Sequence, residues 1–152
     1  MEFRLWDEEQ RIMIYPRPED AVVFINGECS LWKDPQYDDN KGSIYCRQYN
    51  RLIPMLFTGV TDVNGQKIYE KDILTNSYNS IFVVELVRGA FYLKIRHISN
   101  GGESKEIKWL EWLPLGEITR TLILKNFQKI GNTYENPELF KGEQDYDKVS
   151  KG

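Results

Sequence analysis

Short apolar runs separated by turn-forming residues make up the first third of the chain. These runs have the length of β-strands and are too short for helices; they are Phe3–Trp6, Ile12–Tyr15, Ala21–Ile25 and Ser43–Cys46. Asn26-Gly27 tolerates positive φ at both positions, so we expect Ala21–Ile25 to pair across it with Cys29–Trp32. The polar stretch Gln36–Ser43 predicts an exposed loop.

The same strand-length pattern continues from Leu52 onward. Its runs are Leu52–Phe57, Asp72–Leu74, Ile81–Val87, Phe91–His97 and Glu106–Leu113. Asp62–Gly65 marks a turn. Arg88-Gly89-Ala90 predicts a hairpin between Ile81–Val87 and Phe91–His97, because glycine adopts turn conformations that branched residues resist.

The end of the chain gives mixed signals. Residues 116–131 permit a helical face yet carry many β-branched side chains, which favours a short helix or turn passing into a strand at Phe127–Thr133. Asn136 as N-cap and Pro137 at the first position predict a brief helical turn. The charged residues 141–152 predict a disordered tail.

Together these elements predict a mainly β fold, either a small barrel or a sandwich, with short helical segments. We expect an N-terminal β region over residues 1–52 to pack on a barrel region over residues 53–140, followed by the tail at 141–152. A chain of 152 residues has the usual size of one domain, so one compact unit is expected overall.

The net charge of −3 argues against a global positive field for nucleic-acid binding, so such binding would need a local patch. The N-terminus shows no secretory signal and no apolar run is long enough to span a bilayer, so we expect a cytoplasmic protein with no membrane partner. Cys29 and Cys46 lack metal-site spacing and are expected to be free thiols.

Candidate catalytic groups are few. His97 is the one histidine, and it alternates with Phe91 and Leu93, which favours a partly buried structural role. No phosphate-binding glycine motif occurs. Glu70 and Asp72 are candidates for a carboxylate pair in hydrolysis, but carboxylates beside a turn usually cap backbone N–H groups. We therefore expect no enzyme activity, no cofactor and no metal.

The acidic segment around Asp62 and Gly65 contains the D-x-N-G element of calcium loops. If Gly65 is the sixth loop position, the first and twelfth fall on Val60 and Lys71, where carboxylate ligands are required. The sequence therefore argues against a calcium site.

Three segments resemble the YopX-like family of phage and prophage proteins. Phe3–Asp7 (FRLWD) is similar to its F-R-x-W-D start, and Phe57–Ile73 (FTGVTDVNGQKIYEKDI) to its Y-T-G-L-x-D-x-N-G-x-x-I-Y-E-G-D-I core. Ile130–Leu139 (IGNTYENPEL) is similar to its closing I-G-N-x-Y-E-N-P-E-L. The chain departs from this pattern at Phe57, where tyrosine is common, and at Lys71, where glycine is usual.

The resemblance implies an SH3-like barrel in the C-terminal part and a bacteriophage or prophage origin, hence a bacterial host. It implies no known activity and no catalytic residues. If the glycine position requires positive φ, Lys71 is either strained by about 1 kcal/mol or lies in a differently shaped turn.

Two functions are compatible with these residues. The first is a non-catalytic protein-interaction module for a host or phage protein, with Trp112 as an exposed anchor if it lies opposite Trp109 on the strand Glu106–Leu113. The alternative is nucleic-acid binding through a basic and aromatic sheet face; its residues are Arg88, Tyr92, Lys94 and Arg96. A homo-oligomer is left open.

Overall fold

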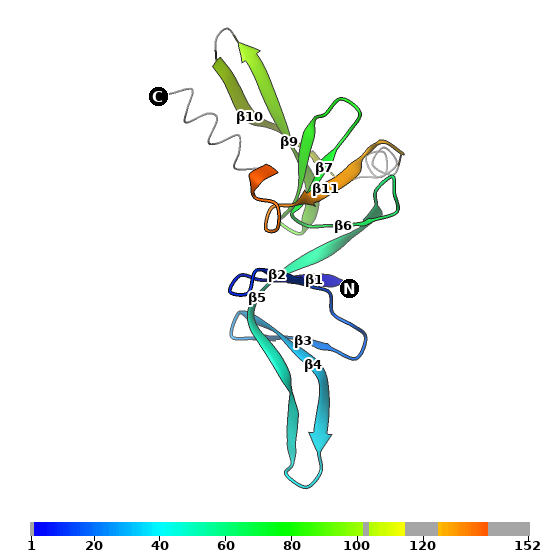
Figure 1. Cartoon of the computed structure of the whole chain (residues 1–152), viewed down its shortest axis with the longest axis vertical. Helices are drawn as coiled ribbons and strands as arrows, with labels where there is room; N and C mark the ends of the chain where they lie inside the picture. The colour runs from blue at the N-terminus through cyan, green and yellow to red at the C-terminus, as the bar shows by residue number, and fades with distance from the viewer. Residues whose placement is uncertain (1, 102–103, 115–124, 140–152) are drawn as a thin grey trace. The chain divides into compact units, whose positions relative to one another are not determined.

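The computed structural model describes residues 2–101, 104–114 and 125–139. These residues are mainly β, as predicted, and they form two antiparallel sheets (Figure 1). The strands are β1 (Phe3–Asp7), β2 (Ile12–Ile14), β3 (Ala21–Ile25), β4 (Glu28–Asp38), β5 (Ser43–Thr61), β6 (Lys67–Tyr69), β7 (Asp72–Thr75), β8 (Ile81–Val87), β9 (Ala90–Gly101), β10 (Ser104–Pro114) and β11 (Gln128–Asn132). Internal contacts divide the chain into two units, Met1–Leu56 and Phe57–Gly152.

The N-terminal unit is an antiparallel sheet in the order β2-β1-β5-β4-β3. Its core is a cluster of buried side chains: Leu5, Ile14, Cys29, Leu31 and Leu52. The hairpin predicted at Asn26-Gly27 is confirmed, since both residues have positive φ (52° and 80°) and β3 pairs with β4. Cys29 and Cys46 are free thiols, as expected, and burial raises the pKa of Cys29.

Strands β4 and β5 are longer than the hydrophobic pattern predicts. Ser43–Cys46 and Leu52–Phe57 belong to one strand of 19 residues, and Gln36–Asp38 extends β4 instead of forming a loop. The two strands pair with each other through this polar region, from Lys33↔Arg47 to Asp38↔Ser43. A paired ribbon satisfies its backbone groups while its polar side chains stay in water, so polarity alone is a poor sign of a loop here.

The C-terminal unit contains an antiparallel sheet in the order β10-β9-β8-β7-β11, and β6 pairs with the end of β5. Its core consists of Val60, Ile68, Leu74, Phe82, Val84 and Leu93. The predicted hairpin between β8 and β9 is confirmed, with Arg88 and Gly89 at φ of 50° and 81°. Over the described strands the sheets do not close into a barrel.

Helical backbone is limited in the described residues to Lys125–Asn126 and to Glu138–Leu139, which lies in the turn predicted after Asn136. That turn is closed by a hydrogen bond from the Leu139 N–H to the Asn136 carbonyl (3.1 Å). The predicted strand near Phe127–Thr133 is confirmed as β11. The predictions for residues 116–124 and for the tail 141–152 lie outside the described residues. The described helical segments include none long and apolar enough to cross a bilayer.

Candidate functional site

Asp62, in the segment that resembles a calcium loop, is a structural carboxylate. The residue is 2% exposed, and its Oδ1 accepts hydrogen bonds from the N–H groups of Asn64 (2.9 Å) and Gln66 (2.8 Å). Its Oδ2 accepts the N–H of Lys129 in β11 (2.9 Å). Asp62 therefore closes its own turn and ties that turn to a strand distant in sequence. Among the described residues no three Asp, Glu, His or Cys side chains are placed to hold a metal ion.

Asp72, a candidate for a catalytic pair with Glu70, lies inside the fold at 0% exposure. Its Oδ2 accepts the N–H of Tyr69 (2.7 Å) and forms an ion pair with Lys129 Nζ (3.2 Å). These contacts hold the tight turn between β6 and β7, which is the capping role that the sequence favours for Asp72.

Lys71 occupies the position where the family that the sequence resembles usually has glycine. Its backbone is nevertheless left-handed, with φ of 71°. Its N–H donates to the Val84 carbonyl (2.7 Å) and its carbonyl accepts the N–H of Thr133 (3.0 Å). Its Nζ pairs with Glu85 Oε2 at 2.6 Å. The turn is thus adapted to glycine-like backbone geometry, and the ion pair offsets part of a strain of about 1 kcal/mol.

The closing motif Ile130–Leu139 is also structural. Asn132 is buried, and its Oδ1 accepts the N–H groups of Tyr134 (3.0 Å) and Glu135 (2.8 Å). The Asn132 N–H donates to Asn136 Oδ1 (3.2 Å), and a Cβ added at Gly131 would overlap that same amide. Asn136 therefore packs against a glycine instead of capping the following turn with its side chain.

The predicted nucleic-acid face combines exposed and half-buried residues in the sheet of the C-terminal unit. Arg88 is exposed in the hairpin turn, whereas Tyr92 and Lys94 are half-buried in β9. Register places Tyr92 opposite Glu85, which is paired with Lys71, and Lys94 opposite Val83, which is 2% exposed. Val83 in turn lies opposite Ile73 at 0% exposure, so the middle of this face is covered and apolar.

Two further predicted site residues are placed by backbone register alone, because their side chains lie outside the described part. Arg96 lies opposite Ile81, and Trp112 opposite Lys94. The register shifts between Trp109 and Glu111, so the uninterrupted alternation assumed for Glu106–Leu113 does not hold in β10. The role of Trp112 as an anchor stays a prediction.

Sequence reasoning missed an exposed ribbon in the N-terminal unit, which we call the arm: residues Lys33–Asp38 of β4 and Ser43–Gln48 of β5. β3 pairs with β4 no farther than Trp32, and β1 reaches β5 only from Ile53 onward, so the arm is two-stranded in the described structure (Figure 1). The signal in the sequence was the apolar and aromatic side chains set within a polar stretch.

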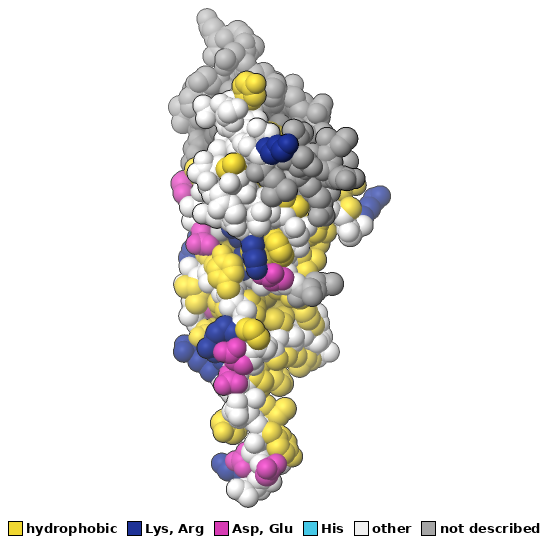
Figure 2. Space-filling view, turned by 90° about the vertical axis from the view of Figure 1, so that its right-hand side faces the viewer, with side chains coloured by type: hydrophobic (Ala, Val, Ile, Leu, Met, Phe, Trp, Pro, Cys, Tyr) yellow, Lys and Arg dark blue, Asp and Glu magenta, His cyan; other side chains and the backbone are white. Residues whose placement is uncertain are grey.

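Large side chains of the arm are open to solvent. Tyr37 and Ile44 lie directly opposite each other and are 63% and 55% exposed, and Tyr45 is 60% exposed. In Figure 2 hydrophobic side chains lie along the edges of the ribbon above its charged tip, which contains Asp39 and Lys41.

The base of the arm is fixed by Asp20. Its Oδ1 accepts the N–H of Asp34 (3.1 Å) and its Oδ2 accepts the N–H of Arg17 (2.9 Å), with Lys33 Nζ at 3.3 Å. Burial acts to raise the pKa of Asp20, but hydrogen bonds led by those from Arg17 outweigh it and lower the pKa from 3.8 to about 2. The carboxylate thus holds the bulge at Asp34, whose φ is 39°.

Comparisons with known proteins agree with the motifs. A family model described as YopX protein matches residues 2–141. A crystal structure of protein EF1440 from Enterococcus faecalis is similar, with a TM-score of 0.52 and 22% identity over 91% of this chain and 96% of that chain. At that identity the likeness concerns the fold. No curated protein matches the chain.

Proposed function

Because this chain belongs to the YopX family, we propose that it is a phage or prophage accessory protein acting as a non-catalytic protein-interaction module in the bacterial cytoplasm. The observation that supports this role is the arm, with Tyr37, Ile44 and Tyr45 each more than half exposed. The partner is a host or phage protein that covers these side chains.

The energetics of the arm favour such a partner. Two-stranded ribbons are marginally stable in water, and clustered exposed apolar side chains commonly mark protein contacts. Tyrosine is well suited to interfaces, because it buries a large ring while its hydroxyl stays hydrogen-bonded. Tyr37 pairs with Ile44 whereas Tyr45 pairs with Gln36, so the ribbon presents the Tyr37–Ile44 pair on one face and Tyr45 on the other.

We also propose that the C-terminal unit is an SH3-like barrel in an open form. Its short antiparallel strands in near-sequential order, β7 to β10, and the family resemblance support this assignment. A barrel scaffold that carries its recognition elements on attached strands and loops is consistent with a binding protein.

Site-specific photo-crosslinking tests the proposal. The crosslinking amino acid p-benzoylphenylalanine replaces Tyr37 or Tyr45 in separate chains, and Tyr78, which is 87% exposed but lies in a turn of the C-terminal unit, serves as the matched control. Each chain is irradiated in bacterial cells before and after prophage induction. We expect a discrete protein adduct from the two arm positions and none from Tyr78.

The other outcomes contradict the proposal in distinct ways. Adducts removed by nuclease treatment would favour the nucleic-acid alternative. An adduct at twice the 18.0 kDa chain mass would make a second copy of the chain the partner. Equal labelling from all three positions, or no adduct from any, would overturn an interaction role for the arm.

A further inference from the structure

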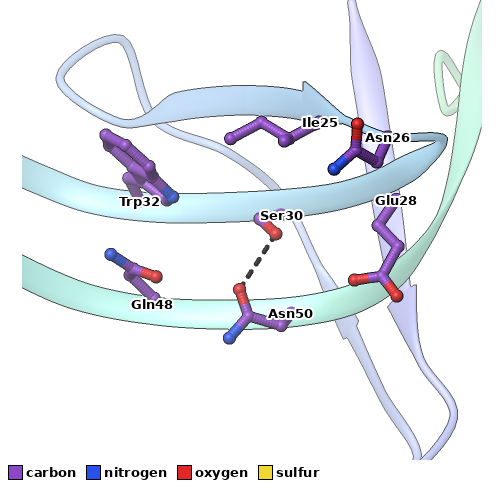
Figure 3. A pocket seen from close by; sticks show the side chains of 7 residues that line it. All are labelled: Ile25, Asn26, Glu28, Ser30, Trp32, Gln48 and Asn50. Carbon is purple, nitrogen blue, oxygen red and sulfur yellow. Dashed lines mark hydrogen bonds between the residues drawn. The ribbon is translucent and has the colours of Figure 1, made fainter.

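A groove of about 350 Å³ lies on the face of the N-terminal sheet away from its core cluster. It is lined by Ile25, Asn26, Glu28, Ser30, Trp32, Gln48 and Asn50, all of which project to the same side of the sheet in Figure 3. Glu28, Ser30 and Trp32 alternate along β4, so they share one face. The small Ser30 between two larger side chains leaves the hollow.

The floor and one wall of the groove are well defined. Ser30 Oγ donates a hydrogen bond to Asn50 Oδ1 (2.9 Å), which joins β4 to β5 across the floor. Trp32 is half-buried and lies opposite Gln48 in the strand register, so an indole and an amide stand together at one end. Neither the Gln48 amide nor the Trp32 indole N–H has a hydrogen-bond partner among the described residues.

The lining contains no Lys or Arg. Its carboxylate, that of Glu28, lies 3.9 Å from Arg51 Nε outside the groove, and would repel a phosphate placed beside it. Anionic ligands are therefore disfavoured. The other polar groups are amides and a hydroxyl, which both donate and accept hydrogen bonds.

We propose that this groove binds a neutral saccharide of one or two pyranose rings. The C–H face of a pyranose packs on the Trp32 indole, and its neighbouring hydroxyls, which also donate and accept, pair with Gln48, Asn50 and Glu28. The volume falls at the lower end of the range for small-molecule sites. The groove is separate from Tyr37, Ile44 and Tyr45, so this inference does not depend on the interaction role of the arm.

Titration of the full ¹⁵N-labelled chain followed by NMR tests the proposal. The chain has four tryptophans, and Trp32→Phe identifies the Trp32 indole signal. Glucose, N-acetylglucosamine, maltose and chitobiose are each added to about 50 mM, because an open groove is expected to bind in the millimolar range. We expect at least one sugar to shift the Trp32 signal saturably.

Trp6 serves as an internal control in the same spectra. Trp6 is 2% exposed and its Nε1 donates to Glu8 Oε2 (2.6 Å), so its indole signal should stay in place. Gln48→Ala should weaken saccharide binding at least threefold without unfolding the sheet, since Gln48 is exposed. Gln36→Ala, an exposed glutamine outside the groove, should leave the affinity unchanged.

Three results would overturn the proposal. One is an unmoved Trp32 signal with all four sugars, and another is unchanged affinity in Gln48→Ala. The third is a shift produced by a pentaproline peptide but by none of the sugars, which would assign the groove to a polypeptide instead.

Discussion

Two regions of the molecule are rich in polar and aromatic residues, which is typical of functional sites. One is the pair of turns around Asp62 and Asp72 in the C-terminal unit, and the other is the arm in the N-terminal unit. In the turns, each carboxylate is buried and accepts hydrogen bonds from backbone N–H groups. In the arm, Tyr37 and Tyr45 are more than half exposed. The same kinds of residue thus serve the fold in one region and face solvent in the other.

This contrast shows that a strong sequence motif is weak evidence for a binding site. The central motif identifies the family, yet its polar atoms hold turns together, and its apolar residues Val60 and Ile68 lie in the core of the C-terminal unit. The arm contains none of the quoted motif segments. Exposure and register, rather than motif strength, separate the two regions.

Asp62→Ala should have the largest effect on stability. Removal of the carboxylate leaves the N–H groups of Asn64, Gln66 and Lys129 without their acceptor, which we expect to lower the free energy of unfolding by about 3 kcal/mol. Urea denaturation followed by circular dichroism measures the change. Asp39→Ala at the exposed tip of the arm is the control, expected to change stability by less than about 0.5 kcal/mol. Equal losses of unfolding free energy at the two positions would contradict the difference between the turns and the arm.

Acid should weaken the N-terminal unit through Asp20. The pKa of this carboxyl is lowered from 3.8 to about 2 on folding, so its contribution is fully present above pH 4 and is lost as the pH falls towards 2. We expect a loss of at most about 2 kcal/mol, because the partner Arg17 is exposed and solvent screens part of the interaction.

Asp20→Asn is the variant that isolates this effect. It should be less stable than the original chain at pH 6. Since the folded pKa is about 2, the difference should shrink to about a third of that value at pH 2.5, as measured by urea denaturation at both values. A constant difference between the two chains across this pH range would show that the Asp20 charge does not hold the base of the arm.

Lys71 provides a smaller and more specific test. Lys71→Gly relieves a left-handed backbone strain of about 1 kcal/mol but removes the ion pair with Glu85, so we expect a net change in unfolding free energy close to zero. Glu85→Gln should cost about 0.5–1 kcal/mol in the original chain and almost nothing in the Lys71→Gly background. If the two changes were additive, the ion pair would not be the feature that offsets the strain.

Local chemistry explains which parts of the fold could be predicted. The hairpins at Asn26-Gly27 and Arg88-Gly89 depend on the residues in the turn itself, so the sequence predicts both correctly. In the arm, Ser43–Cys46 is predicted as a strand but its partner Gln36–Asp38 is not, because that segment is polar and its pairing satisfies backbone groups. The sequence also does not predict the left-handed conformation of Lys71, because lysine does not by itself favour positive φ.

Non-local pairing explains what was missed at the candidate site. The groove depends on Trp32 lying opposite Gln48, a register that no single segment specifies. The predicted basic face assumed that alternation along β9 decides exposure, yet Val83 on the neighbouring strand is 2% exposed. Which side chains share a face follows from sequence, but which face is covered depends on how the strands pack.

Tyr45→Ser should have the smallest effect on stability and is the most direct check of the arm. Tyr45 and Tyr49 are four positions apart on β5, but Tyr45 is 60% exposed whereas Tyr49 packs against the N-terminal core with Arg47 Cζ 4.9 Å from its ring centroid. We expect Tyr49→Ser to lower the unfolding free energy by about 2 kcal/mol and Tyr45→Ser by less than about 0.5 kcal/mol. Urea denaturation of the two variants gives both values. A loss above about 1 kcal/mol for Tyr45→Ser would mean that the ring already contributes to the fold, and the arm would then be a structural ribbon like the turns of the C-terminal unit.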